Sequence, residues 1–222
     1  MTNNKAAVKT YKELRDLGVR EANDYFQKFS EFLTGTKASF ENIKPELFKT
    51  VDLDNGIGCV LDLLAKAETH GKRVMVIGNG GSAGIAMHTL ADYANAGGLK
   101  TLDFYGPALL TCMSNDYGYE NVFSKPIVMF AEAGDILFAI SSSGKSPNIV
   151  AAAKKAKELN CAVVTFSGFD ADNPLRKLGN INFYTPSTHY GFVELSHQTI
   201  IHCILDLFVR IKIYEQEREL LG

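Results

Sequence analysis

The sequence of 222 residues lacks the features that mark nucleic-acid-binding, secreted and membrane proteins. Its net charge is only −2 and its isoelectric point is about 6.2, so we expect no basic surface for nucleic acid. The N-terminal segment, MTNNKAAVKTYKEL, lacks the apolar core of a signal peptide, and no apolar run reaches transmembrane length. We therefore predict a cytoplasmic protein with neither a nucleic-acid nor a membrane partner.

Cysteine is also scarce, and its spacing excludes the common metal and redox motifs. The four cysteines stand singly in apolar surroundings, without a CxxC pair: Cys59, Cys112, Cys161 and Cys203. This pattern predicts reduced core residues. With 46% hydrophobic residues the chain can bury one good core.

The most distinctive stretch is RVMVIGNGGSAGIAMHTLAD, residues 73–92. Residues 73–77 are apolar and β-branched and predict a buried strand, and a helical pattern follows. Between them lies the glycine turn, residues 78–82, in which Gly80 permits close backbone approach and Ser82 is placed to cap the helix. A strand, a glycine turn and a helix N-terminus together predict an anion site. The spacing fits neither the dinucleotide fingerprint nor a Walker loop, so we expect no nucleotide cofactor.

Strands and helices alternate after this stretch. Residues 101–105, 135–140, 161–166 and 181–184 predict strands, and residues 147–159 predict a helix that begins after Ser146. Such alternation predicts a parallel sheet covered by helices on both faces, with ligands beyond the carboxyl ends of the strands.

The serine loop, residues 141–146, follows the second of these strands. It holds four hydroxyls in six residues: Ser141, Ser142, Ser143 and Ser146. Hydroxyls and backbone N–H groups at a helix start suit a phosphate, and the alternative is a hydroxyl-rich turn that caps the helix. Its place after a buried strand favours phosphate.

Both ends of the chain are predicted to be helical. The first seventy residues read as helix, with an aromatic stripe that includes Tyr25, Phe26 and Phe29 and needs a packing partner. The last helix, about residues 191–216, is apolar almost all round from Ile200 to Ile213. Because a helix that is apolar on every side is buried on every side, we expect a homo-oligomer.

Histidines and carboxylates form a second candidate site. His88 and Asp92 share one face of the helix after the glycine turn, while Glu194 and His202 lie two turns apart on the last helix. If the two helices meet, these four residues could bind zinc or a similar divalent ion. A carboxylate and an imidazole that face a sugar could equally form an acid–base pair.

Three segments resemble the sugar isomerase (SIS) domain family, and within it the phosphoheptose isomerase branch. They are IGNGGSAGIAMH at 77–88, ISSSGKSPN at 140–148 and VELSHQTIIH at 193–202. The resemblance covers roughly residues 50–212. It implies a three-layer αβα sandwich with a parallel flavodoxin-like sheet, N-terminal helices, and a homotetramer with active sites at subunit interfaces. By the same resemblance the serine loop would hold the phosphate of a phosphosugar, and Asn79, Gly80 and Ser82 would line the sugar site.

In that branch a His, Glu, Gln and His set binds zinc, and it includes the acid–base pair. Those positions here are His88, Asp92, Glu194 and His202, so an aspartate replaces the glutamate and a glutamate replaces the glutamine. An arginine of the family falls near Ala96, and a Thr-Asp-Thr-Ser loop falls on residues 105–108, YGPA.

We therefore expect residues 50–222 to form a phosphosugar-binding domain, and residues 1–49 to pack on it or on a partner subunit. The expected reaction is aldose–ketose isomerisation, with sedoheptulose 7-phosphate to a heptose 7-phosphate nearest, and with Asp92 and His202 as the acid–base pair. The alternative is a non-catalytic phosphosugar-binding or adaptor protein. A related adaptor subgroup loses the last-helix histidine, and His202 argues against it.

Overall fold

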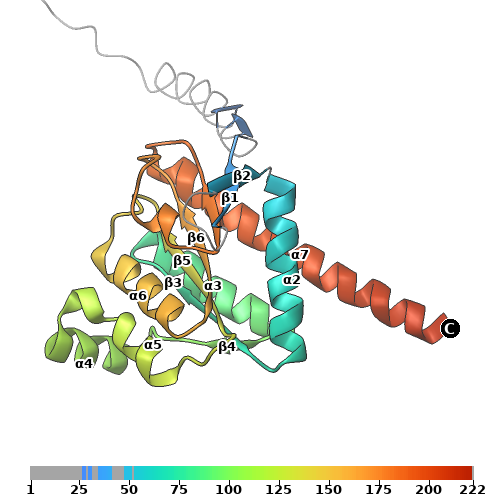
Figure 1. Cartoon of the computed structure of the whole chain (residues 1–222), viewed down its shortest axis with the longest axis horizontal. Coiled ribbons are helices and arrows are strands. Elements are labelled where there is room, and N and C mark those ends of the chain that lie inside the picture. Colours follow the sequence, from blue (N-terminus) through green and yellow to red (C-terminus); the bar gives the residue numbers. More distant parts are fainter. Residues whose placement is uncertain (1–26, 29, 32–34, 42–47, 52, 222) are drawn as a thin grey trace, which may run out of the picture.

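The computed structural model describes residues 27–28, 30–31, 35–41, 48–51 and 53–221. Its centre is a seven-stranded sheet with the order β2-β1-β7-β6-β5-β3-β4. Five strands run parallel: β3 (Arg73–Ile77), β4 (Lys100–Leu102), β5 (Ile136–Ser141), β6 (Ala162–Ser167) and β7 (Ile181–Tyr184). The parallel sheet between helices confirms the predicted αβα sandwich (Figure 1).

Helices cover both faces of the sheet because each connection between parallel strands must cross over it. The crossovers include α2 (Leu53–Thr69), which leads into β3, α3 (Gly81–Asn95), α4 (Pro107–Tyr117), α5 (Ser124–Phe130) and α6 (Pro147–Glu158). Two short 3-10 turns, η1 (Tyr119–Asn121) and η2 (Leu175–Lys177), complete the loops. One apolar cluster lies under α2, α3 and α7, and another lies under α4, α5 and α6.

The N-terminal part corrects one prediction. Where the sequence reads as helix, β1 (Lys37–Glu41) and β2 (Phe48–Val51) form an antiparallel hairpin, and β1 pairs antiparallel with β7. Pairing with the open edge of β7 satisfies backbone groups that a local helical pattern does not reveal. The aromatic stripe of the N-terminal region, with Tyr25, Phe26 and Phe29, lies outside the described residues.

The last helix, α7 (Tyr190–Leu221), runs along the domain and continues beyond it (Figure 1). Its span from Tyr190 to Ile213 is long and apolar enough to cross a membrane, but half of it is buried inside the protein, as in a core helix. Ile204 is buried, whereas Ile211 and Ile213 are 42% and 48% exposed. Burial on every side is therefore not reached within a single chain.

The cysteines also depart from the prediction in part. Cys161 is buried, but Cys112 and Cys203 are exposed and Cys59 lies between these extremes; all four are free thiols. Cys112 and Cys203 lie on helices, where neighbouring residues in the sequence point to different sides. The apolar neighbours of these two cysteines therefore did not predict whether the cysteine side chains are buried.

Candidate active site

The glycine turn and the serine loop lie side by side at the carboxyl ends of two neighbouring strands. β3 and β5 pair in parallel, with Ile77 opposite Ala139, so the turns that follow them meet. They enclose a hollow of about 260 Å³. Its lining includes every predicted phosphate and sugar residue: Asn79, Gly80, Ser82, Ser141, Ser142, Ser143 and Ser146. The geometry thus brings the two predicted anion-binding segments into one cradle.

The serine loop is folded tightly around Gly144. This glycine has a φ of +62°, and a Cβ here would lie 1.9 Å from Oδ1 of Asn173. The Ser141 and Ser146 hydroxyls lie 3.1 Å apart and hydrogen-bond each other. Ser142 is 5% exposed, and its buried Oγ has no partner within the described part of the chain. Because buried hydroxyls are normally satisfied, this unpaired group on the wall of the hollow supports a site for a polar ligand.

Two details of these turns differ from the predictions. Ser82 does not cap α3: the N-cap position is Gly80, with a φ of +55°, and Ser82 lies buried in the first turn. Ser146 is at the N-cap of α6 but makes no capping bond, because its hydroxyl is paired within the serine loop. In both cases the serine hydroxyl therefore does not take up a backbone N–H group of the helix start.

The glycine turn is held from behind by Tyr105, the first residue of the YGPA segment at 105–108. Its hydroxyl accepts a hydrogen bond from the Gly78 N–H at 2.6 Å and donates to the Gly78 carbonyl at 2.8 Å. Burial raises the pKa of Tyr105, which keeps the hydroxyl neutral and able to do both. Tyr105 therefore supports the turn instead of lining the hollow.

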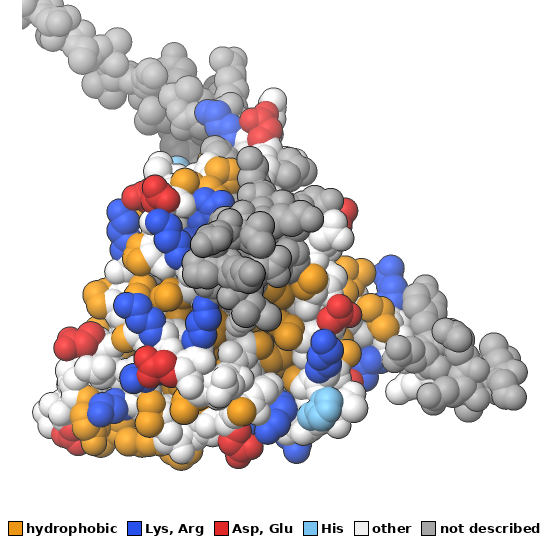
Figure 2. All heavy atoms as spheres, viewed as in Figure 1, with side chains coloured by type: hydrophobic (Ala, Val, Ile, Leu, Met, Phe, Trp, Pro, Cys, Tyr) orange, Lys and Arg blue, Asp and Glu red, His pale blue; other side chains and the backbone are white. Residues whose placement is uncertain are grey.

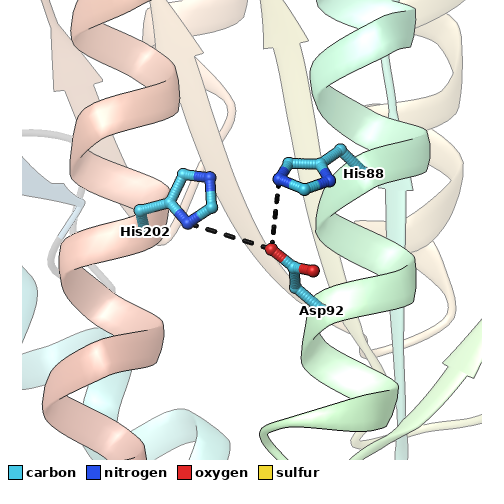
Figure 3. Close-up of side chains that lie close together, drawn as sticks. All are labelled: His88, Asp92 and His202. Carbon is cyan, nitrogen blue, oxygen red and sulfur yellow. Dashed lines mark ion pairs between the residues drawn. The ribbon is translucent and has the colours of Figure 1, made fainter.

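The predicted histidine and carboxylate residues meet where α3 and α7 pack together (Figure 3). Asp92 Oδ2 lies 3.2 Å from His88 Nε2 and 3.9 Å from His202 Nδ1. The two imidazole rings are 5.1 Å apart. Next to them, the Tyr93 hydroxyl donates to the Ile201 carbonyl at 3.1 Å and fixes α3 against α7.

These three residues form the group of possible metal ligands within the described residues. One ligand atom from each lies within 4.8 Å of the others. Two imidazole nitrogens and a carboxylate oxygen are a donor set that zinc accepts, with a further position open for water or substrate. The residues present therefore fit a zinc ion.

Glu194, the fourth predicted ligand, lies elsewhere. Its carboxylate rests against Gly81 at the start of α3, where an added Cβ would approach Glu194 Oε2 to 2.5 Å. Glu194 lines the hollow between the glycine turn and the serine loop. Its role as a metal ligand stays a prediction.

A second hollow of about 400 Å³ continues between α3 and α7, and it shares Gly81 and Glu194 with the first. Its far wall includes Ile85 and Gln198, about one helical turn before His88 and His202 respectively. The serine loop, the glycine turn and the two histidines thus lie along one surface.

A larger hollow, of about 610 Å³, lies at the other end of the sheet, among the amino ends of β3, β5 and β6. Three lysines line it, Lys66, Lys72 and Lys157; Lys66 and Lys157 stand in the last turns of α2 and α6. Cations at helix C-termini offset the helix dipole. On the face of the molecule seen in Figure 2, Lys and Arg side chains are interspersed with Asp and Glu, so the described residues of this face form no surface of one charge sign that would attract an anion. Since parallel sheets bind ligands at their carboxyl ends, we do not place the active site here.

The structure adds residues to the site that the sequence reasoning missed. Tyr190 lines the first hollow, and Asn148 and Tyr119 hydrogen-bond to Asn79. Asn148 could have been found from its place in the first turn of α6, directly after the serine loop. Lys145, the charged residue of the serine loop, forms an ion pair with Asp170 at 3.1 Å.

Comparison with known proteins identifies the family. A family model described as the SIS domain matches residues 39–168. The phosphoheptose isomerase of Geotalea daltonii is 35% identical over 162 residues, which are 70% of this chain and 84% of the relative. That of Helicobacter hepaticus is 34% identical over 165 residues, 72% and 84% of the two chains.

Solved structures give the same answer. A phosphoheptose isomerase from Francisella tularensis has a TM-score of 0.72 at 25% identity and covers 87% of this chain and 98% of its own. The enzyme from Neisseria gonorrhoeae has a TM-score of 0.69 at 25% identity, with coverage of 90% and 98%. The chain therefore belongs to the SIS domain family, in its phosphoheptose isomerase branch.

Proposed function

We propose that this protein isomerises sedoheptulose 7-phosphate to a heptose 7-phosphate. The observation that carries the proposal is the arrangement of one phosphate-type cradle and one acid–base group along the same surface between α3 and α7. In a 7-phosphate the phosphate and the carbonyl carbons lie at opposite ends of the sugar. The relatives, which are named phosphoheptose isomerases, support the same substrate.

The reaction moves a proton between two neighbouring carbons. We assign this work to Asp92 and His202; the assignment is supported by the 3.9 Å between Asp92 Oδ2 and His202 Nδ1, which both face the space between the helices (Figure 3). One group takes the proton from the carbon next to the carbonyl while the carbonyl oxygen gains a proton, and an enediol results. The other group then protonates the former carbonyl carbon, and the hydroxyl on the neighbouring carbon loses its proton and becomes the new carbonyl. The hydroxyls of the serine loop hold the phosphate and keep the sugar in register.

Zinc is the metal that we propose for this site, with His88, Asp92 and His202 as its ligands. Glu194, which lines the neighbouring hollow, would become a fourth ligand only if its side chain turned from Gly81 toward the two histidines. When bound, such an ion stabilises negative charge on substrate oxygens. His88 holds Asp92 at 3.2 Å and so orients its carboxylate. A side chain one methylene shorter than glutamate still reaches both histidines in this arrangement.

We also propose a cytoplasmic homo-oligomer, a tetramer by the family resemblance. Large apolar side chains are exposed on α3 and α7 close to the site: Met87 is 49% exposed, Leu195 41% and Tyr190 61%. Further along α7, Ile211 and Ile213 are also exposed. Exposed apolar groups on adjoining helices are typical of subunit interfaces. The predicted boundary at residue 50 falls inside β2, and β1 already belongs to the sheet, so the proposal that the N-terminal region packs on this domain or on a partner subunit applies to the part of residues 1–49 that precedes β1.

The non-catalytic adaptor alternative is not favoured. It requires no convergence of titratable residues, whereas His88, Asp92 and His202 meet in the structure. The relatives reported above are likewise named isomerases.

An isomerisation assay with sedoheptulose 7-phosphate tests the proposal, with purified protein, added zinc, and a chelated sample. Asp92→Ala should lower kcat by about 100-fold or more, since a positioned acid or base contributes that much. Asp62→Ala, which removes an exposed carboxylate on α2, is the matched control and should leave kcat unchanged. Absence of turnover by the wild type, or full turnover by Asp92→Ala, would refute the proposed reaction.

A further inference from the structure

The site contains a pair of asparagines whose amides are locked together. Asn79 Nδ2 donates to Asn148 Oδ1 at 2.9 Å, and Asn148 Nδ2 donates to Asn79 Oδ1 at 2.9 Å. Asn79 follows β3 in the glycine turn, while Asn148 stands in the first turn of α6 after the serine loop. The reciprocal pair therefore ties the two ligand-binding segments to each other.

The orientation of the Asn148 amide is set by the backbone. Its Oδ1 also accepts a hydrogen bond from the Ile149 N–H at 3.0 Å. If the amide were turned around, Nδ2 would face this N–H, donor against donor. The Ile149 N–H would keep its second bond, to the Ser146 carbonyl at 3.1 Å, but the two facing donors would repel each other, and Asn148 is 1% exposed, so water cannot come between them. The Asn148 Nδ2 must consequently point toward Asn79.

This fixes Asn79 in turn. Its Oδ1 accepts from Asn148 Nδ2 and from the Tyr119 hydroxyl, at 2.9 and 3.1 Å, and these two donors use both lone pairs. Its Nδ2 has two hydrogens, of which Asn148 takes one. The other makes no hydrogen bond to any residue that the structure describes, and Asn79 lines the hollow beside the serine loop.

We propose that Asn148 is a positioning residue that makes Asn79 a hydrogen-bond donor toward the bound phosphosugar. The ligand atom that Asn79 recognises is then an acceptor oxygen, of a phosphate, a carbonyl or the enediolate, and a group that can only donate is excluded. Asn148 does not itself line the hollow, and it acts through Asn79. The inference rests on the proposed phosphosugar isomerase function.

A double-mutant cycle tests this role, with kcat and KM for sedoheptulose 7-phosphate measured for the wild type, Asn79→Ala, Asn148→Ala and the double variant. Asn148→Ala should lower kcat/KM by about tenfold, the effect of about 1.4 kcal/mol lost from one hydrogen-bond arrangement. The double variant should be no worse than Asn79→Ala, because Asn148 acts only through that side chain.

Asn182→Ala is the matched control. Asn182 is a fully buried asparagine on β7, whose Oδ1 accepts from Thr165 and the Gly179 N–H and whose Nδ2 donates to the Gly179 carbonyl, away from the site. Its loss should lower the melting temperature without changing kcat/KM of the folded enzyme. If Asn148→Ala does not fold, Tyr119→Phe enters the same cycle, since Tyr119 is exposed and supplies the other donor to Asn79.

Losses that multiply in the double variant would overturn the positioning role, because Asn148 would then act independently of Asn79. Equal effects of Asn148→Ala and Asn182→Ala on kcat/KM would overturn it as well. Failure of the wild type to isomerise the sugar is a separate result: it refutes the proposed function before the cycle is read.

Discussion

The pH dependence of the free energy of unfolding tests the packing between α7 and β6. The His197 side chain is fully buried, with Nε2 3.1 Å from the Ser167 carbonyl oxygen and its ring 5.9 Å from that of Phe166. Because a carbonyl only accepts, Nε2 carries the proton and Nδ1 is bare. Nδ1 has no partner within the described part of the chain. Burial lowers the pKa of His197 from 6.5 to about 4, although the Ser167 carbonyl partly opposes this shift.

The direction of the effect follows from proton uptake. The unfolded chain protonates His197 near pH 6.5 and the folded chain near pH 4, so its contribution to stability is complete above pH 6.5 and is lost as the pH falls toward 4. The whole shift corresponds to roughly 3 kcal/mol, of which about 2 kcal/mol is lost between pH 7 and pH 5.

Urea unfolding of the wild type and His197→Gln, followed by circular dichroism at pH 7 and pH 5 and at fixed protein concentration, measures this term. Glutamine keeps a donor for Ser167 but does not titrate. The free energy of unfolding should fall by about 2 kcal/mol more in the wild type than in the variant. His70→Gln, which replaces an exposed histidine at the end of α2, should keep the wild-type pH dependence. An identical fall in the wild type and His197→Gln would refute the assigned burial and tautomer.

Three further substitutions test the cradle. Ser142→Ala should leave the melting temperature nearly unchanged, because the hydroxyl has no partner among the described residues, but should weaken phosphosugar binding by about 10-fold or more in calorimetry; an unchanged affinity would contradict its role. Gly144→Ala should lower the free energy of unfolding by about 2 kcal/mol or more in urea titration, since the new Cβ would overlap Asn173 at a positive φ; a neutral effect would show that the loop has another conformation. Tyr105→Phe should lower the free energy of unfolding by about 1–3 kcal/mol, because the Gly78 N–H and carbonyl each lose a partner. An unchanged melting curve for Tyr105→Phe would contradict this.

Much of the fold was accessible from local patterns. Apolar runs such as residues 73–77 and 135–140 predicted β3 and β5, and the alternation with helices predicted their parallel pairing. The N-terminal hairpin was not accessible, because β1 is a strand through its pairing with β7, at the far end of the chain. Pairing at such distance leaves no periodic trace that distinguishes it from a helix.

The site divides in the same way. The two glycine and serine segments follow strands, so their meeting could be deduced from strand order, and the convergence of His88, Asp92 and His202 needed only that α3 and α7 touch. The position of the Glu194 side chain depends on its rotamer, and the two hydrogen bonds between the Tyr105 hydroxyl and the Gly78 backbone depend on the close approach of two segments. Residue types specify neither of these.

The pairing of distant segments at the site has a consequence for how the protein folds. Asn79 and Asn148 are 69 positions apart, and the bond from Tyr93 to Ile201, beside Asp92 and His202, spans 108 positions. Contacts between residues so far apart in the sequence form slowly, because the entropy of closing the long loop is lost before the contact contributes any stabilising energy. Isolated helices can appear early in refolding, but the cradle and the cluster of His88, Asp92 and His202 exist only once the sheet and α7 are both in place. Recovered catalytic activity is therefore a late reporter, and it should lag the helical signal in circular dichroism.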